Sequence, residues 1–394
     1  EDLSGDFTFS RNSAATRVNA QGLVENVQIL SSDLVSNGDF SQIGTEEVLN
    51  GNFSQEGSEL VTNGDFSNGN ANWTLDGTNA PIVENGLLKF SFSNGTYSRA
   101  RQNIGIVNAK ITYTVVNSNV STLQLRDYGG ADSQDVPATV GTHTIYRNFT
   151  GNGINFQSGG VDSGILEIDN VSVKEVGQDW SIGAGWSIGE DKVVGDGTMG
   201  ANVFGQNVGF TQGNTYKFSF TIEDYISGSI YIREPFNGYL EPVNSNGNHS
   251  FYYVAGASNQ LDFRGNSFIG SITNISVKEV GQNWNLGTGW SIGEDKAIND
   301  GSGFGALSSS YSNFNSKKLK VNFDILNYVS GEIRVPPSYR QDGLDIRYSA
   351  NGSYELIYDS INSSFALNTV NFNGSVTNIS VLEITDDTNL PRIN

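Results

Sequence analysis

A long internal repeat constrains the fold of this chain more than any other feature of its sequence. The segment Asn170–Trp180 returns nearly unchanged as Asn274–Trp284 and, truncated, as Asn378–Glu383, with an offset of 104 residues each time. Gly185–Lys192 and Gly289–Lys296 are identical and show the same offset. A period of this length is far too long for a solenoid, and it matches one β-sandwich domain per repeat.

Each repeat contains a block in which apolar and polar residues alternate. Phe218–Arg233 in the second repeat matches Val321–Val335 in the third, and Ile111–Arg126 is a diverged version in the first. The pattern predicts a long strand, a turn at the Ser-Gly pair and a returning strand. In the second repeat it places Phe218 and Phe220 toward the core.

The composition along the whole chain agrees with this pattern. Short runs of Val, Ile, Thr, Tyr and Phe alternate with clusters of Gly, Asn and Ser, and the chain has 47 Gly but only 7 Pro. Such a texture is typical of many short strands joined by tight turns. We therefore expect an all-β chain with three tandem jelly-roll β-sandwich modules, at residues 60–177, 178–281 and 282–384.

A shorter repeat precedes the modules. Asn37–Ser41, Asn50–Ser54 and Asn63–Ser67 lie 13 residues apart, and each predicts a short strand that enters an Asn-Gly turn. Only the third copy leads directly to a tryptophan and a full module. We therefore interpret residues 33–59 as strand-turn repeats of a linker or stalk, between a β-hairpin platform segment at residues 1–32 and the first module.

The tryptophans mark the beginnings of the repeats. Trp73, Trp186 and Trp290 each follow a Gly/Asn-rich turn at the head of a module. A core plug between the two sheets is favoured there over a platform for sugar stacking. Trp180 and Trp284 stand at the module junctions, where we expect them to join neighbouring modules.

The charge balance and the lack of cysteine exclude several classes of function. The net charge is −20, with only 22 Lys and Arg, so the surface repels phosphate backbones and anionic membranes. We expect neither a nucleic-acid nor a membrane partner, and solubility is the simplest role of the acidity. Disulfides, thiolate zinc sites and cysteine nucleophiles are excluded, because the chain has no cysteine.

Candidate catalytic residues are few. His143 and His249 are the only histidines, they occupy equivalent places in two repeats, and Tyr354 takes that place in the third. This pattern favours a structural role. The adjacent carboxylates Glu190 and Asp191 would point to opposite faces of an extended segment, which argues against a catalytic pair. We therefore expect no enzymatic activity.

Two carboxylates of the first module suggest a metal site. Asp65 begins this module and Asp169 lies on its last strand. First and last strands of a jelly roll are often neighbours, so these carboxylates and nearby carbonyls would suit Ca²⁺. Thr273 and Thr377 replace Asp169 in the later modules, which would confine calcium to the first. The alternative is an Asx turn with a solvated carboxylate.

The outward face of the long strand pair is the predicted ligand surface. Its candidate residues are Arg126 in the first module, Tyr231 and Arg233 in the second, and Arg334 in the third. Aromatic rings stack on sugars, and guanidinium groups donate hydrogen bonds to hydroxyls. A solvated face without a ligand is the alternative.

The ends of the first module resemble a known family. The opening Asn63–Ser67 with its following tryptophan, and the closing Ile168–Val173, resemble carbohydrate-binding modules of the galactose-binding-like jelly-roll kind. The resemblance extends over most of residues 60–384, although its motifs are degenerate. It implies a jelly roll, a structural calcium between the first and last strands, and glycan contacts on a concave face or at loop tips.

A second resemblance involves both ends of the chain. Phe7–Glu25 is similar to a segment of tail-fibre and head-fibre proteins of tailed bacteriophages, where it runs on to an Asn-Leu-Pro-Arg-Ile motif. That motif stands here at Asn389–Ile393, so the modules are inserted between its halves. Residues 385–394 would then complete the platform to which the predicted hairpin Thr16–Val24 belongs.

These features favour a non-enzymatic virion surface protein. We expect a phage fibre or decoration protein that binds host-surface glycans and contacts other virion proteins. The resemblance to fibre proteins implies a homotrimer. The alternatives are a bacterial adhesin, the non-catalytic modules of a secreted polysaccharide-degrading enzyme, and a structural spacer without a ligand.

The split motif also predicts where the two ends lie. An inserted segment leaves and returns to one place, so we expect Glu25 and Asn389 to lie together. Neighbouring first and last strands put both termini of a jelly roll at one end. We therefore expect the three modules to cluster around their shared ends rather than to extend as a rod.

Overall fold

The computed structural model describes residues 16–18, 24–26, 29–105, 108–158, 163–234, 238–239 and 241–385. Apart from one short 3-10 helix, η1 (Pro337–Tyr339), every element in these ranges is a β-strand. The predicted all-β class is confirmed. No helix in the described ranges has the length and apolar character needed to cross a membrane.

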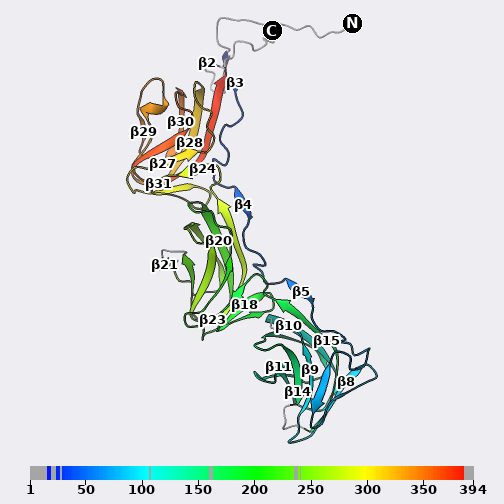
Figure 1. The fold of residues 1–394 in the computed structure, drawn as a ribbon. Helices are drawn as coiled ribbons and strands as arrows, with labels where there is room; N and C mark the ends of the chain where they lie inside the picture. The colour runs from blue at the N-terminus through cyan, green and yellow to red at the C-terminus, as the bar shows by residue number, and fades with distance from the viewer. Residues whose placement is uncertain are drawn as a thin grey trace, which may run out of the picture.

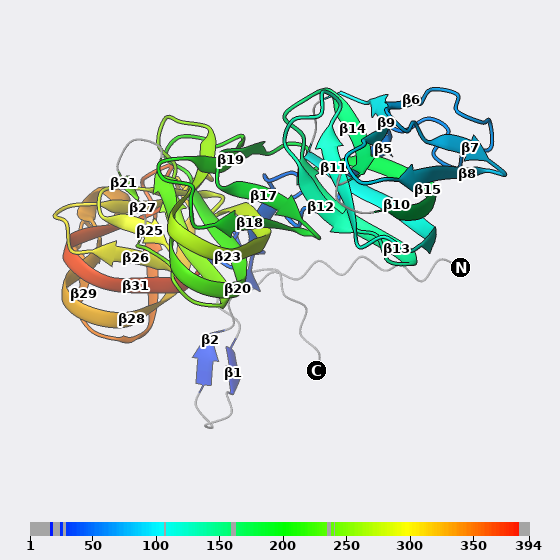
Figure 2. The ribbon, with the colours of Figure 1, turned by 90° about the horizontal axis from the view of Figure 1, so that it is seen from below.

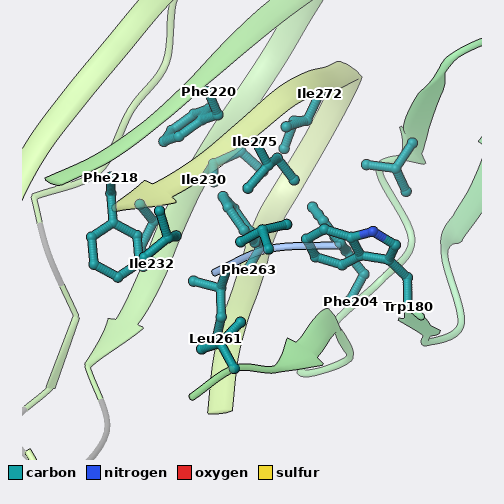
Figure 3. Close-up of a cluster of buried hydrophobic side chains, with 14 of the residues drawn as sticks. Trp180, Phe204, Phe218, Phe220, Ile230, Ile232, Leu261, Phe263, Ile272 and Ile275 are labelled. Carbon is teal, nitrogen blue, oxygen red and sulfur yellow. The ribbon is translucent and has the colours of Figure 1, made fainter. Parts of the chain in front are cut away.

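Three clusters of buried side chains divide these residues into three β-sandwich units. Unit 1 takes its core from residues 61–173, unit 2 mainly from residues 176–277 and unit 3 mainly from residues 280–381. Figure 1 shows the units in a row, with unit 1 at one end and unit 3 at the other. In the core of unit 2, drawn in Figure 3, Phe218 and Phe220 point inward as the alternation predicts.

Unit 1 consists of two antiparallel sheets. One contains β5 (Glu56–Glu59), β7 (Ile82–Glu84), β8 (Leu87–Phe92), β10 (Asn108–Ser118), β13 (Gly141–Asn148) and β15 (Gly164–Val176). The other contains β6 (Thr74–Gly77), β9 (Ser98–Asn103), β11 (Thr122–Asp127), β12 (Gln134–Pro137) and β14 (Gly153–Ser158). Their orders are β13–β10–β15–β8–β7, with β5 added to β15, and β12–β11–β14–β9–β6. Buried side chains such as Ile111 and Phe156 fill the space between them.

Units 2 and 3 share one strand order. Unit 2 contains β16 (Ser181–Ile182), β17 (Trp186–Gly189), β18 (Lys192–Asp196), β19 (Val203–Asn207), β20 (Thr215–Glu234), β21 (Gly238–Tyr239), β22 (Gly247–Val254) and β23 (Gln260–Val280). Unit 3 contains β24 (Trp284–Leu286), β25 (Trp290–Ile292), β26 (Ala297–Asp300), β27 (Ala306–Ser309), β28 (Lys318–Val335), β29 (Ile346–Tyr348), β30 (Gly352–Asp359) and β31 (Ala366–Thr385). The order β16–β19–β23–β18–β17 returns as β24–β27–β31–β26–β25, while β20 and β28 pair with β23 and β31.

The long strands of units 2 and 3 bend without reversing. β20 pairs antiparallel with β23 along nearly its whole length (Figure 2). The register of this pairing shifts around Ser227. The predicted turn and returning strand at Ser227-Gly228 are therefore wrong. Gly228 has a φ of 81°, and a Cβ there would lie 2.2 Å from the carbonyl oxygen of Ser267. A left-handed residue pressed against the neighbouring strand bends the pair, and the chain continues in one direction.

Residues 33–59, expected to form a linker or stalk, are part of the sandwiches. We call residues 29–59 the strap. Its strands pair with the last strand of each unit in reverse chain order: β5 with β15 of unit 1, β4 (Ile43–Glu46) with β23 of unit 2, and β3 (Ile29–Leu30) with β31 of unit 3. Thirteen extended residues span about 43 Å at about 3.3 Å each, enough to pass from one unit to the next.

The start of the strap lies beside the end of the last strand of unit 3. Ile29 pairs with Thr385 and Leu30 with Ile384, although the units extend in a row (Figure 1). The expectation of clustered modules is therefore wrong. That expectation assumed that a rod must separate the two ends of the inserted segment. Here the strap runs along the rod from unit 3 to unit 1, and the three units then lead the chain back to unit 3.

Part of the predicted platform lies outside the described residues. β1 (Thr16–Val18) and β2 (Val24–Asn26) pair antiparallel, at the place where the sequence predicts a hairpin. Asn389 and its neighbours are not among the described residues. The contact between Glu25 and Asn389 therefore stays a prediction.

An aromatic pair fixes each copy of the 13-residue repeat in its unit. The pairs are Phe66 with Trp73 in unit 1, Phe53 with Trp180 in unit 2 and Phe40 with Trp284 in unit 3, with ring centroids 5.4, 5.1 and 5.4 Å apart. Each indole Nε1 also donates a hydrogen bond to the carbonyl oxygen of the asparagine that begins the copy, at 3.1, 3.0 and 3.0 Å.

These pairs correct the expected roles of the tryptophans. The residues equivalent to Trp73 are Trp180 and Trp284, which belong to the cores of units 2 and 3 rather than joining neighbouring modules. Trp186 and Trp290 are also buried in those cores. The error arose because the phenylalanine partners lie in the strap, far away in the sequence.

The contact of each copy with the last strand of its unit explains why the copy contains an Asn-Gly pair. In unit 2, Asn50 has a φ of 49°, a conformation that Asn tolerates better than most residues. The carbonyl of Gly51 accepts a hydrogen bond from the Ile275 amide at 2.9 Å, and a Cβ on Gly51 would lie 1.9 Å from the Ile275 carbonyl oxygen. A larger residue cannot occupy this position without moving the strap. The other two copies make the same contact.

Neighbouring units also meet through a tyrosine. Tyr146 of unit 1 packs against the core of unit 2, and Tyr252 of unit 2 packs against the core of unit 3. Burial raises the pKa of Tyr146, and the nearby carboxylates of Glu190 and Asp191 add to that effect. A tyrosine therefore joins unit 1 to unit 2 and unit 2 to unit 3, in addition to the strap.

Phe53→Ala tests the aromatic pair of unit 2. Phe53 is 2% exposed and contacts Trp180 and Phe204, so its removal should leave a cavity and cost unit 2 about 3–5 kcal/mol. Native-state hydrogen exchange resolved by unit should show this loss in unit 2. Leu49→Ala, at a strap position that is 61% exposed, should cost less than about 0.5 kcal/mol. Equal losses for both variants would contradict the role of Phe53.

Glu56→Gln tests a weaker, pH-dependent contact of the strap. Lys110 and Lys174, at 2.6 and 2.8 Å, lower the pKa of Glu56 from 4.5 to about 2. A lowered pKa stabilises the folded state above pH 4.5, and this contribution disappears as the pH falls to about 2. Because Glu56 is exposed, we expect a cost below about 1 kcal/mol at pH 7. Chemical denaturation should show no difference near pH 2; the same cost at both pH values would contradict the assignment.

Candidate functional site

The predicted ligand residues all lie on sheet faces that point away from the cores. Arg126 follows the buried Leu125 on β11, Tyr231 and Arg233 flank a buried isoleucine on β20, and Arg334 follows the buried Ile333 on β28. Alternation therefore turns their side chains outward. Since they belong to three units, the structure gives each unit its own face and does not join them in one site.

Unit 2 has a pocket on this face. Tyr231 lies directly opposite Arg264 of β23, and together with Gly200, Gly265 and Asn266 they line a hollow of about 290 Å³. An aromatic ring beside a guanidinium group provides both a stacking surface and hydrogen-bond donors. Arg264 was missed from the sequence, although its place after the buried Phe263 would have predicted an outward side chain.

Arg233 lies outside this pocket, two residues after Tyr231 on the same face of β20. Its Nη1 is 3.6 Å from Oδ2 of Asp262, a residue that is only 5% exposed. Burial raises the pKa of Asp262, and Arg233 opposes that effect. Arg233 therefore balances a buried carboxylate in addition to any contact with a ligand.

Arg334 of unit 3 belongs to a network of ion pairs. Its Nη1 lies 3.8 Å from Oδ2 of Asp345, which is also 2.7 Å from Nη2 of Arg347. Hydrogen bonds to Asp345 and Glu332 raise the pKa of Arg347. The outward face of unit 3 is consequently charged but largely self-paired.

Unit 1 concentrates arginines on the equivalent face. Arg99 and Arg101 of β9 share Asp76, with N–O distances of 2.7 and 2.6 Å. Arg126 instead donates to the side-chain oxygen of Gln124 and to the carbonyl oxygen of Gly130. Within the described ranges, Arg126 has no carboxylate at ion-pair distance.

Units 1 and 2 carry a buried polar side chain with an unsatisfied atom at one equivalent position of this face. Asn155 lies opposite Arg126, and Asp262 lies opposite Arg233. Asn155 is 0% exposed, and among the described residues neither its Nδ2 nor its Oδ1 has a hydrogen-bond partner; Oδ1 of Asp262 also lacks one. An unsatisfied buried group costs about 1–3 kcal/mol, so it requires an explanation.

The two predicted calcium ligands bond mainly to their own neighbours. Asp65 is exposed and its Oδ1 accepts hydrogen bonds from the amide and hydroxyl of Ser67, which is an Asx turn. The carboxylate of Asp169 accepts from the amide and side chain of Asn170. Nowhere in the described part of the chain do three or more His, Cys, Asp or Glu side chains gather in a way that could hold a metal ion. Calcium in unit 1 stays a prediction that rests on two carboxylates and carbonyl oxygens.

The histidines have the same contacts in both units. Nε2 of His143 lies 2.6 Å from the Thr139 carbonyl oxygen, and Nε2 of His249 lies 2.9 Å from that of Ser245. The hydroxyl of Tyr354 donates to the equivalent carbonyl in unit 3, at 2.7 Å. An identical contact made by His and by Tyr supports a structural role.

Comparisons with known proteins give only weak likenesses. No protein-family model and no curated protein sequence matches the chain. The tandem CBM22-1–CBM22-2 domains of Xyn10C from Paenibacillus barcinonensis match 57% of this chain and 98% of theirs, at 11% identity and a TM-score of 0.24.

Two viral structures are similar at the same level. A triple jelly-roll protein of an archaeal virus turret matches 80% of this chain and 90% of its own, at 10% identity and a TM-score of 0.18. A structure of Sulfolobus Turreted Icosahedral Virus matches 77% and 90%, at 11% identity and a TM-score of 0.18. Scores this low carry no argument about function.

Proposed function

We propose that this chain is a non-enzymatic attachment arm of a virion, which presents glycan-binding sheet faces to a host surface. The observation that carries the proposal is the pocket of unit 2, where Tyr231 and Arg264 line a hollow on an outward sheet face. Aromatic and guanidinium groups side by side suit a sugar ring with its hydroxyls.

The pairing of β3 with the end of β31 supports an inserted arm. β3 and the end of β31 pair at unit 3, and unit 1 lies at the opposite end of the row (Figure 1). A carrier protein that holds both ends would therefore project the three units away from itself. This agrees with the split motif at Phe7–Glu25 and Asn389–Ile393, by which the chain resembles phage fibre proteins.

Partners and assembly follow from the same proposal. The partners would be host-surface glycans at the outward faces and other virion proteins near the paired ends, in a homotrimer as in the resembled fibre proteins. Light scattering on the purified chain tests the trimer directly. A monomeric mass would contradict self-assembly of this segment.

Tyr231→Ala and Arg264→Ala test the pocket. We expect each to weaken binding to glycans recognised on a broad array by at least about tenfold, as for central binding residues elsewhere. Ile226→Ala, at a 73% exposed position of the same strand outside the pocket, should leave binding unchanged. Undiminished binding by both pocket variants would contradict this site, and the absence of any bound glycan would favour a structural spacer.

A further inference from the structure

The outward face of unit 1 differs chemically from those of units 2 and 3. Arg101 of β9, Asn155 of β14 and Arg126 of β11 lie directly opposite one another on three adjacent strands, and Arg99 lies two positions from Arg101 on the same face. Three arginines thus gather on one sheet of a chain that has only 22 Lys and Arg and a net charge of −20.

The equivalent rows of the other units lack this cluster. The pair that corresponds to Arg101 and Asn155 is Gly205 and Asp262 in unit 2. In unit 3 the corresponding pair is Ser308 and Ala366. The arginine cluster is therefore a property of unit 1 and not of the repeated fold.

A turn after β11 covers the centre of this row. Arg126 Nη1 donates to the Gly130 carbonyl at 2.7 Å, and Arg101 Nη1 donates to the Tyr128 carbonyl at 3.3 Å. Gly130 has a φ of 87°, and a Cβ there would lie 3.9 Å from Nδ2 of Asn155, which places the turn directly over the amide. Yet the amide of Asn155 and Nε of Arg101 have no hydrogen-bond partner among the described residues.

We infer that this face binds a carboxylate-bearing sugar, with Arg126 as the main ligand of the carboxylate. Asn155 and Arg101 lie beside it, and Arg101 contributes although its Nη2 already pairs with Asp76 at 2.6 Å. The inference rests on the proposed function and names the class of glycan. A carboxylate is a stronger acceptor for guanidinium groups than the neutral carbonyls of Tyr128 and Gly130. In the proposed complex the carboxylate would replace these carbonyls, which requires the turn at Gly130 to move off the face.

The remaining groups suit the sugar itself. The Asn155 amide offers an NH2 group that donates and a carbonyl oxygen that accepts, and these match a sugar hydroxyl that both donates and accepts. Tyr97 and Tyr128 flank the row, each stacked with an arginine whose Cζ lies 4.9 Å from the ring centroid. Arg126 carries most of the specificity, because no carboxylate of the described residues lies at ion-pair distance from it.

The test compares acidic oligosaccharides with matched neutral forms on the complete chain. The probes are oligogalacturonates and sialylated oligosaccharides, each beside its methyl ester, together with a neutral glycan array. We expect the acids to bind and the esters to bind at least about tenfold more weakly, since esterification removes the charge that arginine recognises. Arg126→Gln should reduce binding of the acids by a similar factor, while Lys318→Gln, which removes the same charge from an exposed site in unit 3, should not.

Asn155→Leu separates a binding role from a structural one. Its amide has no partner to lose, so the variant should melt at the same or a higher temperature while it binds the acids more weakly. Equal binding of acids and esters, or unchanged binding by Arg126→Gln and Asn155→Leu, would overturn the inference but leave a glycan-binding function standing. No binding to any glycan, acidic or neutral, would overturn the proposed function as well.

Discussion

The architecture depends on the phenylalanine of each 13-residue copy, which packs against a buried indole in its unit. In unit 1 the contact is local, since Phe66 and Trp73 are 7 residues apart. In units 2 and 3 the same contact closes loops of 127 and 244 residues, from Phe53 to Trp180 and from Phe40 to Trp284. The entropy cost of closing a loop grows only slowly with its length, so one contact geometry can serve at all three separations.

This contact makes the units nested rather than simply consecutive. In the sequence, unit 1 lies between the strap segment of unit 2 and the rest of unit 2. Units 1 and 2 together lie between the strap segment of unit 3 and the rest of unit 3. The start of the strap and the end of β31 therefore pair at unit 3, and unit 1 is the most distant from this pairing (Figure 1). The face with three arginines belongs to this distant unit, and under the proposed function it is the unit that lies farthest from the carrier.

Local patterns in the sequence predicted the strands well and their long-range partners poorly. Alternation placed Phe218 and Phe220 in the core and Tyr231 outside it, because side-chain direction in a strand is a local property. The prediction of a linker for the strap is wrong because an Asn-Gly turn has the same local sequence in a free stalk and in a packed sandwich. The strands that pair with the strap lie more than a hundred residues away, so no local pattern shows the pairing. Ser227-Gly228 was misread for a related reason, since the neighbouring strand decides whether such a pair reverses the chain or bends it.

The candidate site was predicted only in outline. The outward positions of Arg126, Tyr231, Arg233 and Arg334 followed from alternation, but their grouping with Arg264, Arg101 or Asn155 depends on pairing between strands. Among the described residues the Asn155 amide has no hydrogen-bond partner, and the turn at Gly130 lies over it. No sequence pattern carries such information.

Hydrogen exchange on a chain that begins at Gln42 tests the nested arrangement most directly. This truncation removes β3 and Phe40 but keeps the strap segments of units 1 and 2. The account predicts faster amide exchange in unit 3, strongest around Trp284 and the end of β31, with exchange in units 1 and 2 nearly unchanged. Added peptide of residues 29–41 should restore the protection. Unchanged exchange in unit 3, or equal loss of protection in all three units, would contradict the central role of the strap.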